Sequence, residues 1–177
     1  MKWILLIMLS LSALQTFAST SADFETYTKS AEQGDAMAQY NLGIMYVKGQ
    51  GVTQDYKQAF YWYSKAADQG DADAQYNLGI MYVKGQGVTQ DYKQAFNWYS
   101  KAAEQGHTKA QYNLGLMYND GQGVTQNNRK SYIWLAIAAK NGVTNAIKAR
   151  DLVAKELSPT ALESAQEEVR QLSDKIQ

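Results

Sequence analysis

The sequence predicts an all-α protein, an αα-solenoid made of tandem helix-turn-helix repeats of 36 residues. The first observation is an internal repetition: QYNLGIMY begins at Gln39 and again at Gln75, and QYNLGLMY begins at Gln111. The second is that apolar residues recur at helical spacing within each repeat, and the third is that glycine-rich segments separate these runs. Fixed periods between about 20 and 50 residues are typical of solenoids, so the period indicates the architecture before any motif does.

Residues 1–18 are predicted to be a cleavable signal peptide. Met1-Lys2 is a short basic start, Ile4 to Leu14 is almost wholly apolar, and Thr16-Phe17-Ala18 places small residues where signal peptidase requires them. The apolar run is too short for a comfortable membrane span. We therefore exclude this segment from the fold and expect a periplasmic or secreted protein with no integral membrane segment after cleavage.

The first helix of a repeat is expected to follow an aspartate and to end at glycine. In the first repeat Asp35 is the candidate N-cap, and KGQGV ends the helix because Gly49 and Gly51 accept positive φ angles. The apolar face of this helix consists of Ala38, Leu42, Met45 and Tyr46.

The second helix is expected to start at Thr53 or Asp55 and to end at DQG, which finishes with Gly70. Its apolar face consists of Tyr56, Ala59, Phe60, Tyr63 and Ala67. Neither helix can bury its apolar face alone, so the repeats must stack, and the small residues, Gly43 among them, allow close helix packing.

Laid on this period, the repeats are 31–66, 67–102 and 103–138, and both ends are predicted to be atypical caps. Residues 22–33 are expected to form an N-terminal capping helix, and 139–157 a degenerate partial repeat. Residues 158–177 are expected to form a C-terminal capping helix with Ser158 as N-cap and Pro159 in its first turn. Its apolar stripe, which we expect to dock on the third repeat, consists of Leu162, Ala165, Val169, Leu172 and Ile176.

The motif AQYNLGxMYxxGxGV, followed by QDYKQAFYWYSKAADQG, resembles the Sel-1-like repeat family of tetratricopeptide-like proteins. The match is close over 31–138 and loose over 22–33 and 139–157. The resemblance implies a right-handed helical superhelix with a concave binding groove. It also implies a role as an adaptor in protein complexes or signalling, often in exported bacterial proteins.

Composition argues against several other functions. Lys and Arg number 17, as do Asp and Glu, and the charges are interspersed, so we expect no nucleic-acid partner. The chain has no cysteine, which removes disulfides, thiol nucleophiles and cysteine metal sites. His107 is the single histidine and is interpreted as a solvent-exposed residue near a helix cap, and GQGV is interpreted as a turn. We expect no catalytic residue, no metal site and no cofactor.

What remains is a surface line on the first helices, with residues at i, i+4, i+7 and i+11 that the core stripe leaves free. The predicted protein-binding groove consists of Asn41, Lys48, Asp73, Asn77, Lys84, Lys109, Asn113 and Asp120. Asparagine side chains suit an extended peptide backbone because each carries donors and an acceptor. The three asparagines recur in every repeat, which a structural role in bonding to the backbone explains at least as well.

The sequence therefore predicts a monomeric, exported, non-enzymatic interaction module, an adaptor, scaffold or regulator that binds a protein or peptide of unknown identity. Two alternatives stay open. One is a cell-wall or lactam hydrolase, an activity that the resemblance links to cysteine-rich family members, although this chain lacks those cysteines. The other is a structural, self-assembling solenoid, which the near-identity of the first two repeats favours.

Overall fold

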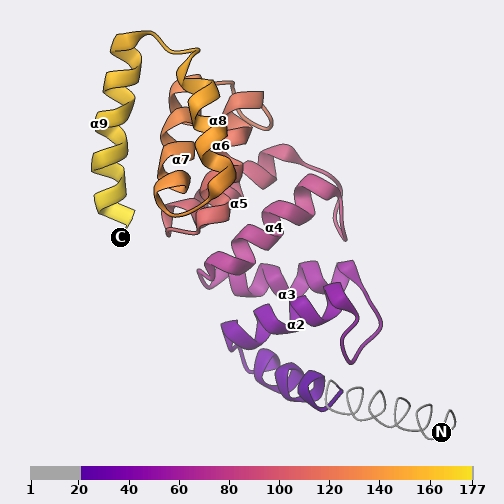
Figure 1. The fold of residues 1–177 in the computed structure, drawn as a ribbon. Coiled ribbons are helices and arrows are strands. Elements are labelled where there is room, and N and C mark those ends of the chain that lie inside the picture. Colours follow the sequence, from indigo (N-terminus) through magenta and orange to yellow (C-terminus); the bar gives the residue numbers. More distant parts are fainter. Residues whose placement is uncertain (1–20, 177) are drawn as a thin grey trace, which may run out of the picture. The chain divides into compact units, whose positions relative to one another are not determined.

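The computed structural model describes residues 21–176, all of which lie in α-helices or in the short connections between them (Figure 1). The predicted signal peptide lies outside the described residues. The helices form two compact units that divide between Asp71 and Ala72, and each unit is described by itself. The prediction of an all-α architecture of helix pairs is confirmed. None of the helices within 21–176 has the length and apolar character needed to cross a membrane.

The first unit contains a helix over 21–32, α2 (Ala36–Lys48) and α3 (Tyr56–Asp68). The predicted N-cap Asp35 is present, and of the two starts left open for the second helix, Thr53 and Asp55, it is Asp55 that caps α3. The Asp35 carboxylate accepts a hydrogen bond from the Ala38 amide at 2.6 Å, and Asp55 accepts two from the first turn of α3. One core cluster of this unit joins all three helices and consists of Ala31, Ala38, Leu42 and Trp62, with Phe24 and Tyr46 packed against it. The helix over 21–32 thus packs against the core of the first repeat.

The second unit contains six helices between Ala72 and Ile176. They are α4 (Ala72–Lys84), α5 (Tyr92–Glu104), α6 (Thr108–Asp120), α7 (Asn128–Lys140), α8 (Thr144–Ala154) and α9 (Pro159–Ile176). Pairs α4–α5 and α6–α7 repeat the arrangement of α2–α3, and α5 packs against α6 and α7 against α8. Within this unit α6 therefore contacts α7, the second helix of its own repeat, and α5, the second helix of the repeat before it.

The glycine of the LG motif allows the two helices of a repeat to approach closely. A Cβ atom on Gly43 would lie 2.6 Å from the Tyr63 ring, and one on Gly115 would lie 2.7 Å from Leu135 Cγ. The ring or branched side chain of the second helix fills the space that glycine leaves. The expectation that this residue permits close packing is confirmed.

The GQGV segment is a turn, as predicted. Gly49 and Gly121 end their helices in the left-handed region, with φ angles of 66° and 67°. Gly123 is under a second constraint, because a Cβ atom there would lie 2.2 Å from the carbonyl oxygen of Tyr92. The loop of the third repeat thus packs on the first turn of the preceding second helix.

The last two helices depart from the repeat. Asp151 of α8 stands at the position that Gly115 occupies in α6, and the face that carries it is exposed. An aspartate side chain there prevents the close approach that glycine allows. Instead, α9 packs against α7, where Ala165 is buried and Leu162, Val169 and Leu172 are half-buried. The predicted docking of this stripe on the third repeat is confirmed.

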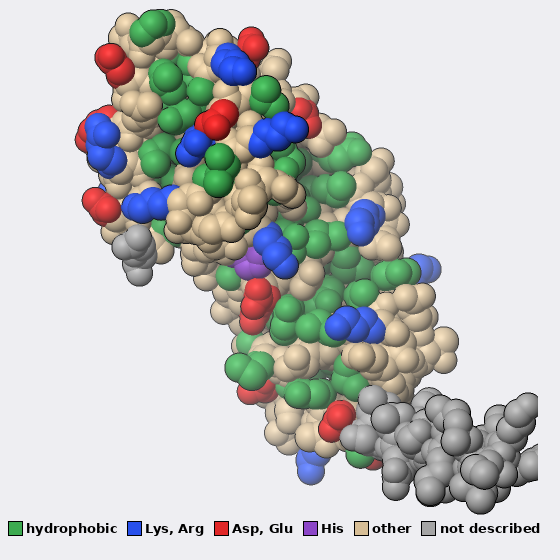
Figure 2. Space-filling model, in the orientation of Figure 1, with side chains coloured by type: hydrophobic (Ala, Val, Ile, Leu, Met, Phe, Trp, Pro, Cys, Tyr) green, Lys and Arg blue, Asp and Glu red, His purple; other side chains and the backbone are tan. Residues whose placement is uncertain are grey.

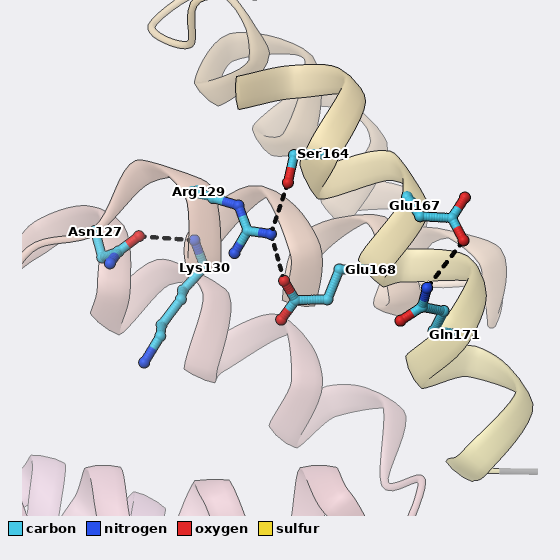
Figure 3. A network of polar contacts seen from close by, with 7 residues as sticks. All are labelled: Asn127, Arg129, Lys130, Ser164, Glu167, Glu168 and Gln171. Atoms are coloured by element: carbon cyan, nitrogen blue, oxygen red, sulfur yellow. Dashed lines mark hydrogen bonds and ion pairs between the residues drawn. The ribbon is translucent and has the colours of Figure 1, made fainter. Parts of the chain in front are cut away.

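Polar contacts hold α9 along the start of α7 (Figure 3). The Arg129 guanidinium of α7 lies 2.5 Å from the Glu168 carboxylate and donates to Ser164 Oγ at 3.1 Å, both on α9. Ser158 caps α9 by accepting from the Ala161 amide at 3.3 Å, and Pro159 is its first residue, as predicted. Because Arg129 and Glu168 are both partly exposed, their ion pair orients α9 more than it stabilises it.

The tryptophans at equivalent positions of the three second helices differ in burial. Trp62 is buried, but Trp98 and Trp134 at the equivalent positions are only half-buried. The Lys101 ammonium lies 4.2 Å from the centroid of the Trp98 ring, so this ring is partly covered by a charged side chain. Tyr99, its neighbour in sequence, is the buried aromatic residue of α5.

Candidate interaction surface

The predicted groove residues lie on the first helices, on the faces that packing leaves accessible. Asn41 is half-buried and Lys48 exposed on α2 of the first unit. In the second unit the four charged members are exposed and the two asparagines half-buried: Asp73, Asn77 and Lys84 on α4, and Lys109, Asn113 and Asp120 on α6. We call the α4 and α6 members, with Ile80 and Leu116 between them, the first-helix line of the second unit.

Asn113 has a structural role as well as a place on this line. Its side chain hydrogen-bonds Tyr76 of α4 and Tyr99 of α5. Burial raises the pKa of both tyrosine hydroxyls, and the bond from Asn113 opposes this shift. The amide therefore ties the third repeat to the second through tyrosine side chains rather than through the backbone. Only part of its hydrogen-bonding capacity remains for a ligand.

His107 is the N-cap of α6. The sequence predicts a solvent-exposed side chain at this position, but the side chain is largely covered. Its Nδ1 accepts from the Ala110 amide at 3.1 Å, and its ring stacks on Tyr76 with a centroid distance of 4.4 Å. Its Nε2 lies 3.2 Å from Asp73 Oδ1, and its side chain is only 14% exposed. The exposure prediction is wrong because α4 of the preceding repeat covers the ring.

Electrostatics in this cluster favour the neutral imidazole. Burial lowers the pKa of His107, and the Asp73 carboxylate opposes that shift without cancelling it. Neutral His107 with its proton on Nε2 satisfies both contacts, since Nδ1 accepts from the backbone and Nε2 donates to Asp73. The cluster thus joins two first helices at their N-terminal turns.

Buried glutamines form polar links that the sequence interpretation missed. Gln111 is fully buried; its Nε2 donates to the Ala103 carbonyl at 3.2 Å, and its Oε1 accepts from Asn141 Nδ2 at 3.1 Å. In the first unit Gln39 makes the equivalent bonds with Ala31 and Gln69. Each such glutamine connects the ends of two successive second helices. The sequence does contain a sign of these links: a glutamine recurs at the same position of each repeat, within an otherwise apolar stripe.

The described residues contain few clusters of acidic residues and histidine, and the His107–Asp73 pair is one of them. Among residues 21–176 no three His, Cys, Asp or Glu side chains lie close enough together to hold a metal ion. The carboxylate nearest to His107, Asp73, is joined to it as part of a helix cap rather than beside a nucleophile. Figure 2 shows basic, acidic and hydrophobic side chains interspersed on the face in view. This distribution differs from the continuous basic patch that is typical of a polyanion-binding surface.

A family model of the Sel1 repeat matches residues 36–71, 72–107 and 108–143. The chain belongs to the Sel1 repeat family. The matched repeats have the predicted period of 36 residues and begin at the first helix. Their boundaries therefore fall five residues after the predicted ones, which begin at residues 31, 67 and 103. Sel1 repeats generally serve as protein–protein interaction modules, and Sel1-repeat proteins are typically helical scaffolds rather than enzymes.

Solved structures of other Sel1 repeat proteins are similar to this one. A protective antigen from uropathogenic Escherichia coli is 38% identical, with a TM-score of 0.79 over 86% of this chain and 33% of that one. A Sel1 repeat protein from Oxalobacter formigenes is 34% identical, with a TM-score of 0.70 over 84% of this chain and 61% of that one. This chain thus spans about a third and three-fifths of their lengths.

Cysteine rich protein B from Helicobacter pylori shares the fold at 21% identity, with a TM-score of 0.60 over 75% of this chain and 96% of that one. No curated protein matches the chain.

Proposed function

We propose that this Sel1 repeat protein is an exported, non-enzymatic adaptor that binds a protein or peptide segment along its first helices. One observation carries the proposal: the packing residues of the first helices are the same from repeat to repeat, whereas the accessible line changes in charge. Asp73 is replaced by Lys109 and Lys84 by Asp120 at equivalent positions of α4 and α6. Variation confined to an accessible face is typical of a recognition surface on a repeated scaffold.

The charged members of the line are suited to selecting a partner. Lys84, Lys109 and Asp120 are all exposed, so they remain hydrated and contribute more to orientation and association rate than to affinity. Asn77 is half-buried, as Asn113 is, and an amide at this depth can reach a bound peptide backbone. The proposal thus assigns specificity to the charges and general backbone recognition to the amides.

Capture of partners from the cell that exports the protein tests the proposal. Lys84→Glu is expected to reduce capture of specific partners while leaving helical content and Tm unchanged, since Lys84 is exposed. The matched control is Lys93→Glu, which changes another exposed lysine, on the second helix α5. Equal partner profiles for the parent protein and Lys84→Glu would contradict the assignment of this line.

Export is tested separately. Expression of the full chain followed by fractionation and N-terminal sequencing is expected to give a mature protein outside the cytoplasm that begins near Ser19. A chain that retains Met1 in the cytoplasm would contradict export and leave the proposed binding surface untouched.

A further inference from the structure

The second helices α3 and α5 have nearly the same sequence, so they can be compared position by position. Their sequences are YKQAFYWYSKAAD and YKQAFNWYSKAAE. They differ at two positions only: Tyr61 of α3 is replaced by Asn97 of α5, and Asp68 is replaced by Glu104. The second exchange keeps a carboxylate. The main chemical difference between the two helices is therefore the presence or absence of one aromatic ring.

In α3 this ring covers a tryptophan. The Tyr61 ring lies edge-to-face against the Trp62 ring, with a centroid distance of 4.9 Å and an interplanar angle of 78°. The Lys65 ammonium lies 5.1 Å from the centroid of the Tyr61 ring. Trp62 is only 9% exposed. The phenol ring of Tyr61 thus contacts both an indole and an ammonium group.

In α5 the ring is missing, and a hollow lies beside the equivalent tryptophan. The hollow has a volume of about 520 Å³, and Asn97 and Trp98 both line it, together with Gln94 and with Tyr118 of α6. Asn97 is exposed, and Trp98 is half-buried where Trp62 is buried. Lys101, the equivalent of Lys65, lies over the indole itself, 4.2 Å from its centroid. A ring at residue 97 would lie within this hollow if it were placed as Tyr61 is in α3.

The groups around the hollow favour an aromatic ligand. Aromatic rings prefer edge-to-face or offset contacts with one another, as the Tyr61 and Trp62 rings show. Lys101 is exposed, so its ammonium can move from the indole to the face of an incoming ring and exchange one cation–π contact for another. An aliphatic side chain in the same place would bury apolar surface but would offer no π face to this lysine.

We infer that the hollow beside Trp98 binds an aromatic side chain of a partner peptide, with the ring placed against Trp98 as the Tyr61 ring is placed against Trp62. The exposed amides of Gln94 and Asn97 carry the donors and acceptors that the peptide backbone on either side of such a residue requires. The inference goes beyond the proposed function, because the hollow lies on a second helix and does not depend on the first-helix line.

The test follows the indole N–H signals of the isotope-labelled, full mature chain by NMR. The probe is N-acetyl-tyrosinamide, and the two comparison ligands are N-acetyl-leucinamide and N-acetylglucosamine. We expect N-acetyl-tyrosinamide to shift the Trp98 signal in a saturable manner, with a Kd on the order of a millimolar. The comparison ligands are expected to bind at least about tenfold more weakly. Equal or tighter binding of either one, or no binding of N-acetyl-tyrosinamide, would overturn the inference.

Two reciprocal variants exchange the residues of α3 and α5. Asn97→Tyr is expected to abolish the response of the Trp98 signal, because its own ring fills the hollow, and to leave the Tm unchanged at this exposed position. Tyr61→Asn is expected to make the Trp62 signal respond to N-acetyl-tyrosinamide, because it removes the ring that covers that indole. A folded Asn97→Tyr variant that still binds the probe, or a Trp62 signal that stays unchanged in Tyr61→Asn, would overturn the inference. The capture experiment with Lys84→Glu tests the proposed function independently of these outcomes.

Discussion

Gly79 of α4 faces the Tyr99 ring of α5 so closely that a Cβ atom at residue 79 would lie 2.4 Å from Tyr99 Cε1. Tyr99 is itself buried, with 3% of its surface exposed. The two residues therefore fit as a pair, and the distance between the helices of this repeat depends on the absence of one side chain.

Gly79→Ala is expected to lower the free energy of unfolding by about 1–3 kcal/mol, since the ring must move in a closely packed interface. Urea denaturation measures this loss. In a double-mutant cycle, the same change in a Tyr99→Ala background is expected to cost less, because the clashing ring is gone. An equal cost in both backgrounds would show that the ring is not the source of the strain.

Gln111→Ala is expected to cost about 1–3 kcal/mol, because it leaves the buried Ala103 carbonyl and the Asn141 amide without their partner. Gln122→Ala, an exposed glutamine in the following turn, is the control and should stay within about 0.5 kcal/mol of the parent. Equal denaturation midpoints for the two variants would contradict the linking role of Gln111.

Stability is expected to fall with acidification through His107. Its folded-state pKa lies below the ordinary value of 6.5, so the unfolded chain binds a proton more readily than the folded chain does. The contribution of the neutral imidazole is therefore complete above pH 6.5, declines below it, and levels off once the pH is below the folded-state pKa. His107→Asn keeps a side-chain cap without this titration.

The difference in unfolding free energy between the parent protein and His107→Asn is the quantity to measure, because the acid titration of the carboxyl groups is common to both. We expect it to be constant at neutral pH and to shift against the parent as the pH falls below 6.5. A shift in the opposite direction would mean that Asp73 stabilises the imidazolium more than burial disfavours it.

Truncation after Leu157 is expected to expose the apolar surface of α7, because Ala165, Val169 and Leu172 pack against that helix's cluster. The shortened chain should unfold at lower urea concentration and associate in sedimentation experiments. Arg129→Ala is the control: it removes the polar contacts of α9 yet should cost no more than about 1 kcal/mol. An equally stable, monomeric truncated chain would show that α9 is dispensable for covering α7.

The sequence by itself determined the period, the helices and their ends. These features depend on local chemistry: Asp35 and Asp55 cap helices through bonds within one turn, and Gly49 ends a helix because its φ is positive. The repetition also determined that the repeats stack, because the apolar face of a single repeat can be buried only against a neighbouring repeat.

Only the tertiary structure decided which polar residues are buried and what they contact. Gln111 and Asn113 stand near each other on α6, yet one links the ends of second helices and the other bonds two tyrosines of the preceding repeat. His107 is covered by Tyr76, and α9 packs on α7 where α8 carries Asp151 instead of glycine. Several of these outcomes depend on side chains far away in sequence: Gln111 and Asn141 are 30 residues apart. A helical pattern gives the direction of a side chain from its own helix, whereas its burial depends on the neighbouring repeat.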